Sequence, residues 1–259
     1  MDQALAILQG FGREPGRSAY AVVRSAVGEW SGGVESDTPR PAASLLKLPL
    51  AMAIEPRLAG LSGQRVADLL APDDDGSVLQ ALESDRVLSP GELLRIMLST
   101  SDNPCARWAW RSVGSGAVEV SLHEAAAHST TLNPDAGEGM GFAGVTTARD
   151  AVALLRAALD PGRFPVTSGA LGHSIRNSRI PLGATDLDVR IAHKTGTLAG
   201  VGHDVAHLRC RGGDMWIAFL AEEQHDILVT GYEMGICTRA LLDHFGLAVV
   251  RTASADVTA

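Results

Sequence analysis

The sequence predicts a mixed α/β fold (α+β), in which an antiparallel sheet of five strands is flanked by helices and carries an inserted all-helical lobe. Two observations predict this fold. Strand-type segments stand near the two ends of the chain, two before residue 43 and three after residue 187. Between residues 43 and about 158, apolar residues recur mostly at helical spacing. Because short turns join consecutive strands, these should pair antiparallel, with the helical block as a second lobe.

The elements of the sheet lobe follow from local patterns. Near the start, we expect an amphipathic helix and then two strands joined by a tight turn, at residues 2–11, 18–25 and 27–34. Near the end, we expect three strands and a closing helix, at residues 188–196, 202–210, 214–221 and about 228–245. Gly212, Gly213 and Asp214 predict the turn between the last two strands.

The central block predicts several helices. Its segments with helical spacing are "SLLKLPLAMAI", "SGQRVADLLA", "SPGELLRIMLSTS", "NPCARWAWRSV", "SGAVEVSLHEAAA" and "TARDAVALLRAAL". Ser89 and Thr147 are typical capping residues at two of the helix starts. Residues 161–188 are rich in turn formers. We expect one domain of residues 1–259, made of an α/β lobe (1–42 and 188–259) and a helical lobe (43–187).

Composition excludes several classes of partner. The formal charge of -8 provides no basic surface for nucleic acid or an anionic membrane. No apolar run approaches the roughly 18 to 20 residues that span a bilayer. The first residues lack the features of a secretory signal, which favours a cytoplasmic location unless a longer secreted chain has been trimmed. The expected partner is a small-molecule substrate, and the expected state is a monomer or a weak homo-oligomer.

Cysteines and histidines give no metal-binding pattern. Cys105, Cys210 and Cys237 form no close pair, which is typical of free thiols in a reducing compartment. His203 and His207 can share a strand face, but the chain contains neither C-x-x-C nor H-E-x-x-H. The sequence therefore predicts no metal and no cofactor.

Three short motifs carry the candidate chemistry. In chain order they are Ser44-Leu45-Leu46-Lys47, Ser101-Asp102-Asn103 and Lys194-Thr195-Gly196. Each motif alone is a weak signal, because few residues are fixed. Together, in this order and placed at a helix start, at a turn before a helix and in a strand, they indicate a serine nucleophile with a lysine base.

The physical argument for Ser44 and Lys47 rests on their spacing. At a helix start, free backbone N–H groups and the helix dipole favour negative charge on Ser44. Lys47 lies one turn later on the same face, among leucines that can desolvate its amine. A second cation at Lys194 would lower the pKa of Lys47 further, which makes a neutral general base feasible. The alternative is a surface lysine with a solvated amine.

These motifs resemble those of the serine β-lactamase and penicillin-binding peptidase family, particularly the class A β-lactamases and related serine hydrolases. "STSDNPCARWAW" resembles the family's SDN helix, "GVTTARDAVALL" the helix after its omega loop, and "AHKTGTLAGVGHD" its KTG strand with the strand that follows. The resemblance covers essentially the whole chain. It implies a β-lactamase/DD-peptidase-like fold and acyl-enzyme chemistry on a β-lactam, amide or ester.

The resemblance also implies roles for the motif residues. Ser101 is expected to relay a proton to the leaving group under the electrostatic influence of Lys194, and Asn103 to orient Lys47 and a substrate amide. Asp102 is expected to hold the turn.

The lysine-threonine-glycine strand is expected to bind substrate. Thr195 and Thr197 are two residues apart, so they point to the same face of the strand, and both are expected to bind a carboxylate of the substrate. Gly196 points to the opposite face, where its missing side chain leaves room for close packing. The backbone N–H groups of Ser44 and Thr197 would form the oxyanion hole.

One departure from the family concerns deacylation. Class A enzymes carry a glutamate in an E-x-x-x-N pattern before a T-T pair, which here is Thr146-Thr147. This sequence has "TTLNPDAGEGMGFAGVTT" instead, and the nearest acids, Glu124 and Glu138, do not fit the pattern. Without a base that positions water, an acyl-enzyme formed from a β-lactam should persist.

A second departure concerns the substrate carboxylate. His203 stands where class A enzymes often carry a carboxylate-binding arginine. Three possibilities remain open: a protonated His203 binds the carboxylate, Arg209 reaches it, or the substrate has none.

Three functional hypotheses remain. The first is a serine hydrolase with the acyl-enzyme mechanism. The second is a cytosolic acyl-transfer or cyclisation enzyme of natural-product biosynthesis on the same fold. The third, from another class, is a sensor or binding domain that is acylated by β-lactams and stays acylated.

Overall fold

The five-stranded sheet is antiparallel, as predicted, with strand order β2-β1-β10-β9-β8. The computed structural model describes residues 2–72, 74–133, 143–247 and 249–251. The sheet lobe contains α1 (Gln3–Phe11), β1 (Arg17–Ser25), β2 (Gly28–Val34), β8 (Val189–Leu198), β9 (Val201–Cys210), β10 (Gly213–Ala221) and α8 (Ile227–His244). β8 is the strand at one edge of this sheet. The mixed α/β fold predicted from the sequence is therefore confirmed.

The central part of the chain builds the helical lobe. Its helical elements are η1 (Ala43–Leu46), α2 (Lys47–Ile54), η2 (Glu55–Gly60), α3 (Val66–Leu69), η3 (Val78–Ala81), α4 (Pro90–Ser99), α5 (Asn103–Glu124), α6 (Ala148–Ala158) and α7 (Pro165–Leu171). The short helix η4 (Ile180–Ala184) packs instead against α8, on the other face of the sheet. Short strands accompany them: β3 (Arg40–Pro41), β4 (Gln64–Arg65), β5 (Val87–Leu88), β6 (Thr131–Asn133) and β7 (Ala143–Thr146).

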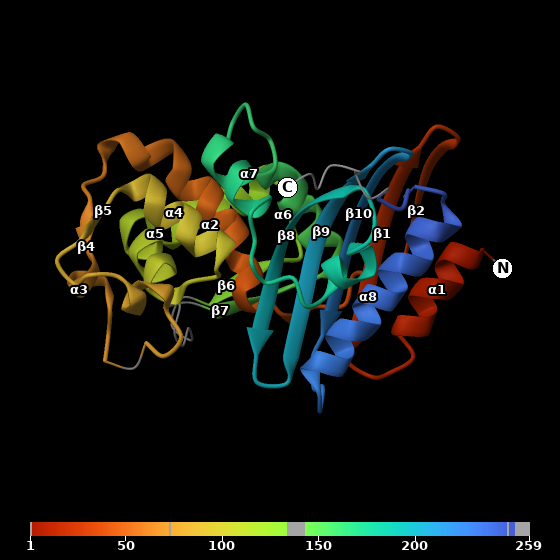
Figure 1. Cartoon of the computed structure of the whole chain (residues 1–259). Coiled ribbons are helices and arrows are strands. Elements are labelled where there is room, and N and C mark those ends of the chain that lie inside the picture. Colours follow the sequence, from red (N-terminus) through yellow and green to blue (C-terminus); the bar gives the residue numbers. More distant parts are fainter. Residues whose placement is uncertain (1, 73, 134–142, 248, 252–259) are drawn as a thin grey trace, which may run out of the picture.

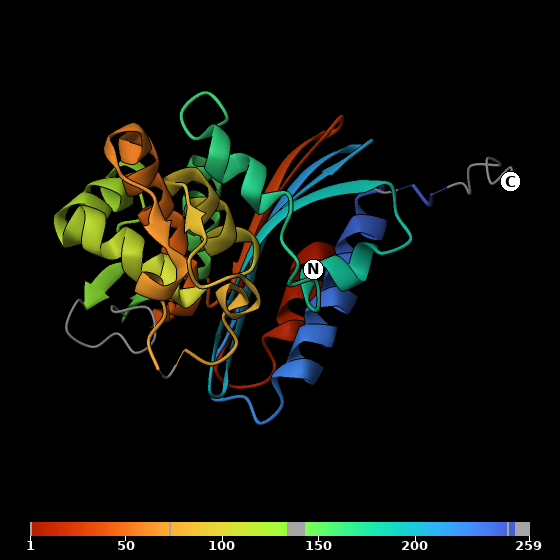
Figure 2. The same cartoon turned by 60° about the vertical axis from the view of Figure 1, so that its left-hand side comes forward.

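The sheet separates two hydrophobic cores. Helices α1 and α8 cover one face, and the helical lobe lies against the other (Figures 1 and 2). The core under α1 and α8 includes Leu8, Phe219 and Leu241, all fully buried. The other core surrounds α2, whose eight residues are all buried. Apart from Lys47, α2 is apolar on every side, and such a helix is stable only inside a core, so Lys47 is held in a rigid element directly after Ser44.

Some elements differ locally from those predicted. The segment "SGQRVADLLA" contains β4 and the four-residue helix α3 rather than a longer helix. The two helices expected on either side of residue 114 are contiguous in α5, but Gly114 has φ 71° and ψ 172° and interrupts the helical backbone. The turn-rich stretch contains α7 and η4. In the described part of the chain, no helix is both long and apolar enough to cross a bilayer.

The predicted helix caps are present. Ser89 and Glu92 form a reciprocal capping box at the start of α4. The Thr147 side chain accepts a hydrogen bond from the Asp150 backbone N–H at the start of α6. Helix α6 then packs against β1, β9 and β10, so that it covers the sheet on the side of the helical lobe.

Candidate active site

The first motif lies where the helical lobe meets the edge strand β8. Ser44 is half-buried in η1, directly before α2. An ideal Cβ built on Gly196 would lie 3.2 Å from Ala43 Cβ and 3.3 Å from the Ala42 carbonyl oxygen. The missing side chain therefore lets β8 approach the start of η1 closely, as predicted for Gly196.

Lys47 connects the first motif to the second. Its amine is fully buried and donates hydrogen bonds to the Ser101 carbonyl oxygen at 2.6 Å and to Asn103 Oδ1 at 2.7 Å. The Ser101 hydroxyl oxygen lies 3.4 Å from the same amine. Burial lowers the pKa of Lys47 to about 7, although the Asp102 carboxylate acts in the opposite direction. A large fraction of Lys47 is therefore neutral near pH 7.

Lys194 connects the third motif to the second. It is 1% exposed, and its amine donates to Ser101 Oγ at 2.8 Å and to the Thr195 carbonyl oxygen at 2.7 Å. Burial lowers the pKa of Lys194 well below its ordinary value, and the neighbouring charge of Lys47 lowers it further. The Ser101 hydroxyl thus lies between two buried amines whose pKa values are both lowered.

The Ser101-Asp102-Asn103 turn is held by its central carboxylate. Ser101 has φ 64°, in the left-handed region. Asp102 is 5% exposed and accepts hydrogen bonds from the Cys105 N–H at 3.0 Å, the Ser77 hydroxyl at 2.6 Å and the Val78 N–H at 3.2 Å. Asp102 therefore caps α5 and fixes the turn, as expected from the sequence.

The structure brings the three motifs together, but it does not place His203 for substrate binding. Asn103 and Thr197 are exposed, whereas Thr195 is buried. His203 is fully buried; its Nδ1 accepts from the Ala221 N–H at 3.0 Å, and its Nε2 therefore donates to the Pro41 carbonyl oxygen at 2.6 Å. Burial lowers the pKa of His203 to about 4, so the imidazole is neutral. A role for His203 as a carboxylate-binding cation does not fit this placement.

The other cation considered from the sequence also lies elsewhere. The Arg209 side chain is 69% exposed, and its Nε lies 3.7 Å from Asp214 Oδ1 near the far end of β9. From there it does not reach Thr195 or Thr197, which stand five or more residues along the neighbouring strand from its cross-strand partner Arg190.

Arg179 is a buried cation beside the third motif that the sequence analysis did not consider. It is 6% exposed; its guanidinium donates to the Gly196 carbonyl oxygen at 2.9 Å, to the His203 carbonyl oxygen and to Thr197 Oγ1 at 2.7 Å. The following residue is anchored because the Ile180 N–H donates to the buried carboxylate of Asp204. Sequence reasoning missed Arg179 because it lies in the turn-rich stretch, 18 residues before Thr197.

A second arginine lies at the rim of the site. Arg176 is exposed, and its Nε donates to the Thr100 carbonyl oxygen at 3.1 Å, next to the second motif. It is close enough to contribute to the lowered pKa values of Lys47 and Lys194. No sequence pattern singled out Arg176 or Arg179, which share the turn-rich stretch of residues 161–188 with Arg163.

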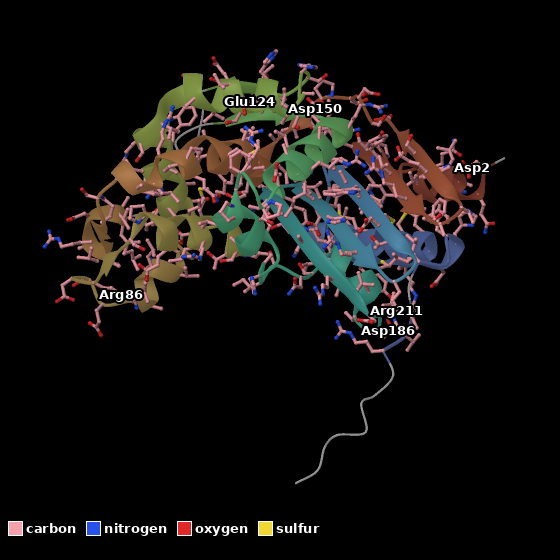
Figure 3. The ribbon with its side chains drawn as sticks, turned by 90° about the horizontal axis from the view of Figure 1, so that it is seen from above. Asp2, Arg86, Glu124, Asp150, Asp186 and Arg211 are labelled. Atoms are coloured by element: carbon pink, nitrogen blue, oxygen red, sulfur yellow. The ribbon has the colours of Figure 1, made fainter. Side chains whose placement is uncertain are left out.

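Of the two acids nearest to the expected deacylation position, the structure describes Glu124, which does not lie at the site. Glu124 ends α5 and forms an ion pair with Arg163 at 2.6 Å, and both side chains are about half exposed; Figure 3 shows Glu124 on the outside of the helical lobe. Glu138 lies outside the described residues. Within the described residues, Lys47 and Ser101 form no hydrogen bond or ion pair with a carboxylate.

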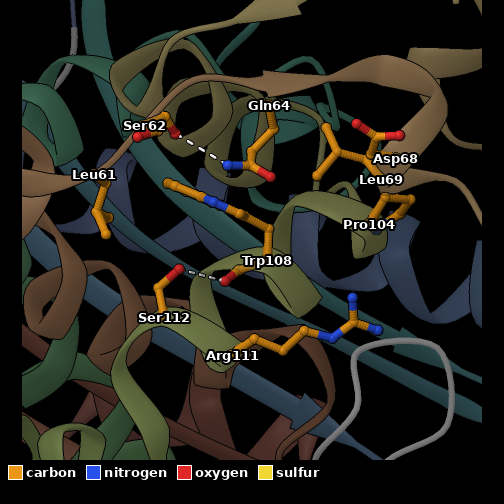
Figure 4. A pocket seen from close by; sticks show the side chains of 9 residues that line it. All are labelled: Leu61, Ser62, Gln64, Asp68, Leu69, Pro104, Trp108, Arg111 and Ser112. Carbon is orange, nitrogen blue, oxygen red and sulfur yellow. Dashed lines mark hydrogen bonds between the residues drawn. The ribbon is translucent and has the colours of Figure 1, made fainter.

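A separate cavity of about 260 Å³ lies in the helical lobe (Figure 4). It is lined by Leu61, Ser62, Gln64, Asp68, Leu69, Pro104, Trp108, Arg111 and Ser112. The Trp108 indole forms one of its walls, and none of the motif serines or lysines lines it. Among the described residues, no group of three or more histidines, cysteines or acids is arranged to hold a metal ion.

The chain belongs to the β-lactamase enzyme family, because the family model described as "Beta-lactamase enzyme family" matches residues 3–243. No curated protein sequence gives a match. Among solved structures, a β-lactamase from Sphaerobacter thermophilus is similar, with a TM-score of 0.78 and 22% identity over 94% of this chain and 97% of that chain.

Two further solved structures share the fold. PBP-A has a TM-score of 0.78 and 19% identity over 95% of this chain and 96% of that chain. A last-common-ancestor class A β-lactamase of Gram-negative bacteria has a TM-score of 0.76 and 21% identity over 95% of this chain and all of that chain. These similarities show that the fold is that of the class A β-lactamases.

Proposed function

We propose that the chain is a serine acyl-enzyme catalyst, in which Ser44 attacks the carbonyl carbon of a β-lactam, amide or ester. The observation that carries the proposal is the contact of the Ser101 side chain with two buried amines, Lys47 and Lys194. Burial lowers the pKa of Lys47 to about 7 and the pKa of Lys194 well below its ordinary value. A neutral amine one turn from a serine is a competent general base.

The proposed acylation step uses the three motifs in turn. Lys47 accepts the Ser44 hydroxyl proton as the oxygen forms a bond to the substrate carbonyl carbon. The backbone N–H groups of Ser44 and Thr197 stabilise the negative oxygen of the tetrahedral intermediate. As the carbon–nitrogen or carbon–oxygen bond breaks, the Ser101 hydroxyl gives its proton to the leaving group and recovers one from Lys47.

The fate of the acyl-enzyme distinguishes the hydrolase from its alternatives. The sequence lacks the E-x-x-x-N pattern that would position water, so hydrolysis of a β-lactam acyl group should be slow. A substrate that delivers its own nucleophile would complete an acyl transfer or cyclisation instead. An acyl group that stays in place would suit a β-lactam sensor.

Intact-protein mass spectrometry after incubation with benzylpenicillin and a cephalosporin tests this proposal. We expect a one-to-one adduct that survives for minutes to hours on the wild type and is absent from Ser44→Ala. Rapid ring opening without an adduct would contradict slow deacylation and would make Glu138 the next residue to substitute. Neither adduct nor ring opening would contradict β-lactam acylation and favour an unrelated ester or amide substrate.

Arg179 is proposed to bind the substrate carboxylate together with Thr197. Arg179→Gln should reduce the second-order acylation rate for benzylpenicillin by about 10- to 100-fold, because a charge-assisted hydrogen bond is lost. The same variant should acylate normally with a phenylacetyl thioester that carries no carboxylate. Arg163→Gln, which removes an exposed arginine in the helical lobe, serves as control. Equal losses on both substrates would show that Arg179 only supports the fold of β8.

A further inference from the structure

A row of charged residues crosses all five strands of the sheet. Strand register places Arg190 opposite Arg209, Arg209 opposite Asp214, Asp214 opposite Arg24, and Arg24 opposite Glu29. Directly opposite residues lie on the same face of a sheet, and Arg211 and Asp186 mark this end of the sheet in Figure 3. From β8 to β2 the charges are therefore positive, positive, negative, positive and negative.

The row is balanced at one end and unbalanced at the other. Arg24 and Glu29 form an ion pair at 2.5 Å, and Arg209 Nε lies 3.7 Å from Asp214 Oδ1. Arg190 forms no ion pair with any described carboxylate and stands opposite another arginine. Like charges directly opposite each other destabilise a sheet. The edge strand β8 thus ends the row with an uncompensated positive charge.

A cavity of about 450 Å³ opens at this unbalanced end. It lies between α7 and the strands β8 and β9, and is lined by Leu159, Pro161, Ser168, Gly172, Arg190, Ile191, Ala192, His207 and Arg209. The His207 ring stacks on Trp216 with centroids 3.8 Å apart, and its Nε2 lies 3.1 Å from Asp214 Oδ1. Two arginines therefore line one cavity together with Ser168 and several apolar residues.

We propose that this cavity binds a small oxyanion, such as the phosphate group or paired carboxylates of a small molecule, between Arg190 and Arg209. An anion there would restore the alternation of charge along the row. Arginine matches this chemistry because its planar guanidinium presents several N–H donors to an oxyanion. The site is separate from the catalytic one: Arg190 stands four residues before Lys194, about 13 Å along β8.

Thermal unfolding and calorimetric titration of the full chain test the site. The probes are inorganic phosphate, a phosphate monoester and citrate, each compared with sodium chloride at equal ionic strength. We expect phosphate to raise the melting temperature of the wild type beyond the effect of chloride. Comparison of the dissociation constants of the monoester and citrate shows whether a phosphate group or paired carboxylates bind more tightly.

Two variants make the test decisive. Arg190→Gln should raise the dissociation constant at least tenfold, yet without anion it should melt no lower than the wild type because it removes the like-charge pair. Arg95→Gln, which changes an exposed arginine on α4, should bind like the wild type. Equal binding by all three proteins, or a response no larger than that to chloride, would overturn the proposal whether or not Ser44 is acylated.

Discussion

Replacing Lys47 with methionine should reduce the rate of Ser44 acylation by about 10³-fold, the range expected for loss of a general base. Methionine keeps most of the length and apolar volume of the buried side chain but accepts no proton. Stopped-flow measurement of acylation by a chromogenic cephalosporin provides the rate. Arg95→Met, on the helical lobe surface, should acylate normally. A loss below tenfold would mean that another group removes the Ser44 proton.

Lys47→Met should also remove the pH dependence of the acylation rate near pH 7. Because the pKa of Lys47 is about 7, wild-type acylation should increase as pH rises through 7 and then level off, as the amine loses its proton. The residual acylation rate of Lys47→Met should not show this rise with pH. If Lys194 were the base instead, the rise of the acylation rate with pH would be absent from Lys194→Met and present in Lys47→Met.

The titration of Lys47 should also make the free energy of unfolding depend on pH. The amine has a pKa of about 7 when folded and 10.5 when unfolded, so between these values the unfolded chain binds one more proton. The free energy of unfolding of the wild type therefore rises with pH across this window, by up to roughly 5 kcal/mol from Lys47. Urea denaturation of wild type and Lys47→Met at pH 7 and pH 9 compares the two slopes.

Replacing Asp102 with alanine should lower the free energy of unfolding by roughly 3 kcal/mol. The substitution removes the cap of α5 and leaves the Ser77 hydroxyl and the Val78 N–H without their acceptor. Ser89→Ala removes the more exposed cap of α4 and should cost only about 1 kcal/mol. Urea denaturation measures both variants. Equal losses of unfolding free energy in Asp102→Ala and Ser89→Ala would show that the hydrogen bonds of Asp102 to Ser77 and Val78 do not contribute to stability.

Much of the fold was predictable because its signals are local. Each sheet strand ends within two residues of its predicted bounds, since alternation and turn residues define strands over short distances. The three motifs were also predictable, because each occupies a recognisable local context. Their meeting at one site depends on contacts between lobes, and the resemblance to a known family rather than the spacing suggested it.

The position of Arg179 beside Thr197 was not predictable for a physical reason. His203 occupies a suggestive position in the strand, but its side chain faces the interior next to Pro41. Arg179 donates to Thr197 Oγ1, and the Asp204 carboxylate accepts a hydrogen bond from the adjacent backbone N–H, that of Ile180. Such an arrangement depends on the packing of η4 against β9 and leaves no periodic trace in the sequence.

The burial of Lys47 and Lys194 has a practical chemical consequence. They are the two lysines of the chain, and its other twenty basic residues are arginines, which do not deprotonate under ordinary conditions. With these lysines 0% and 1% exposed, the folded surface presents no side-chain primary amine to an electrophile. A reactive ester or β-lactam therefore finds no competing lysine side chain on the surface, so that lysine modification adds little to the stoichiometry of covalent labelling expected at Ser44.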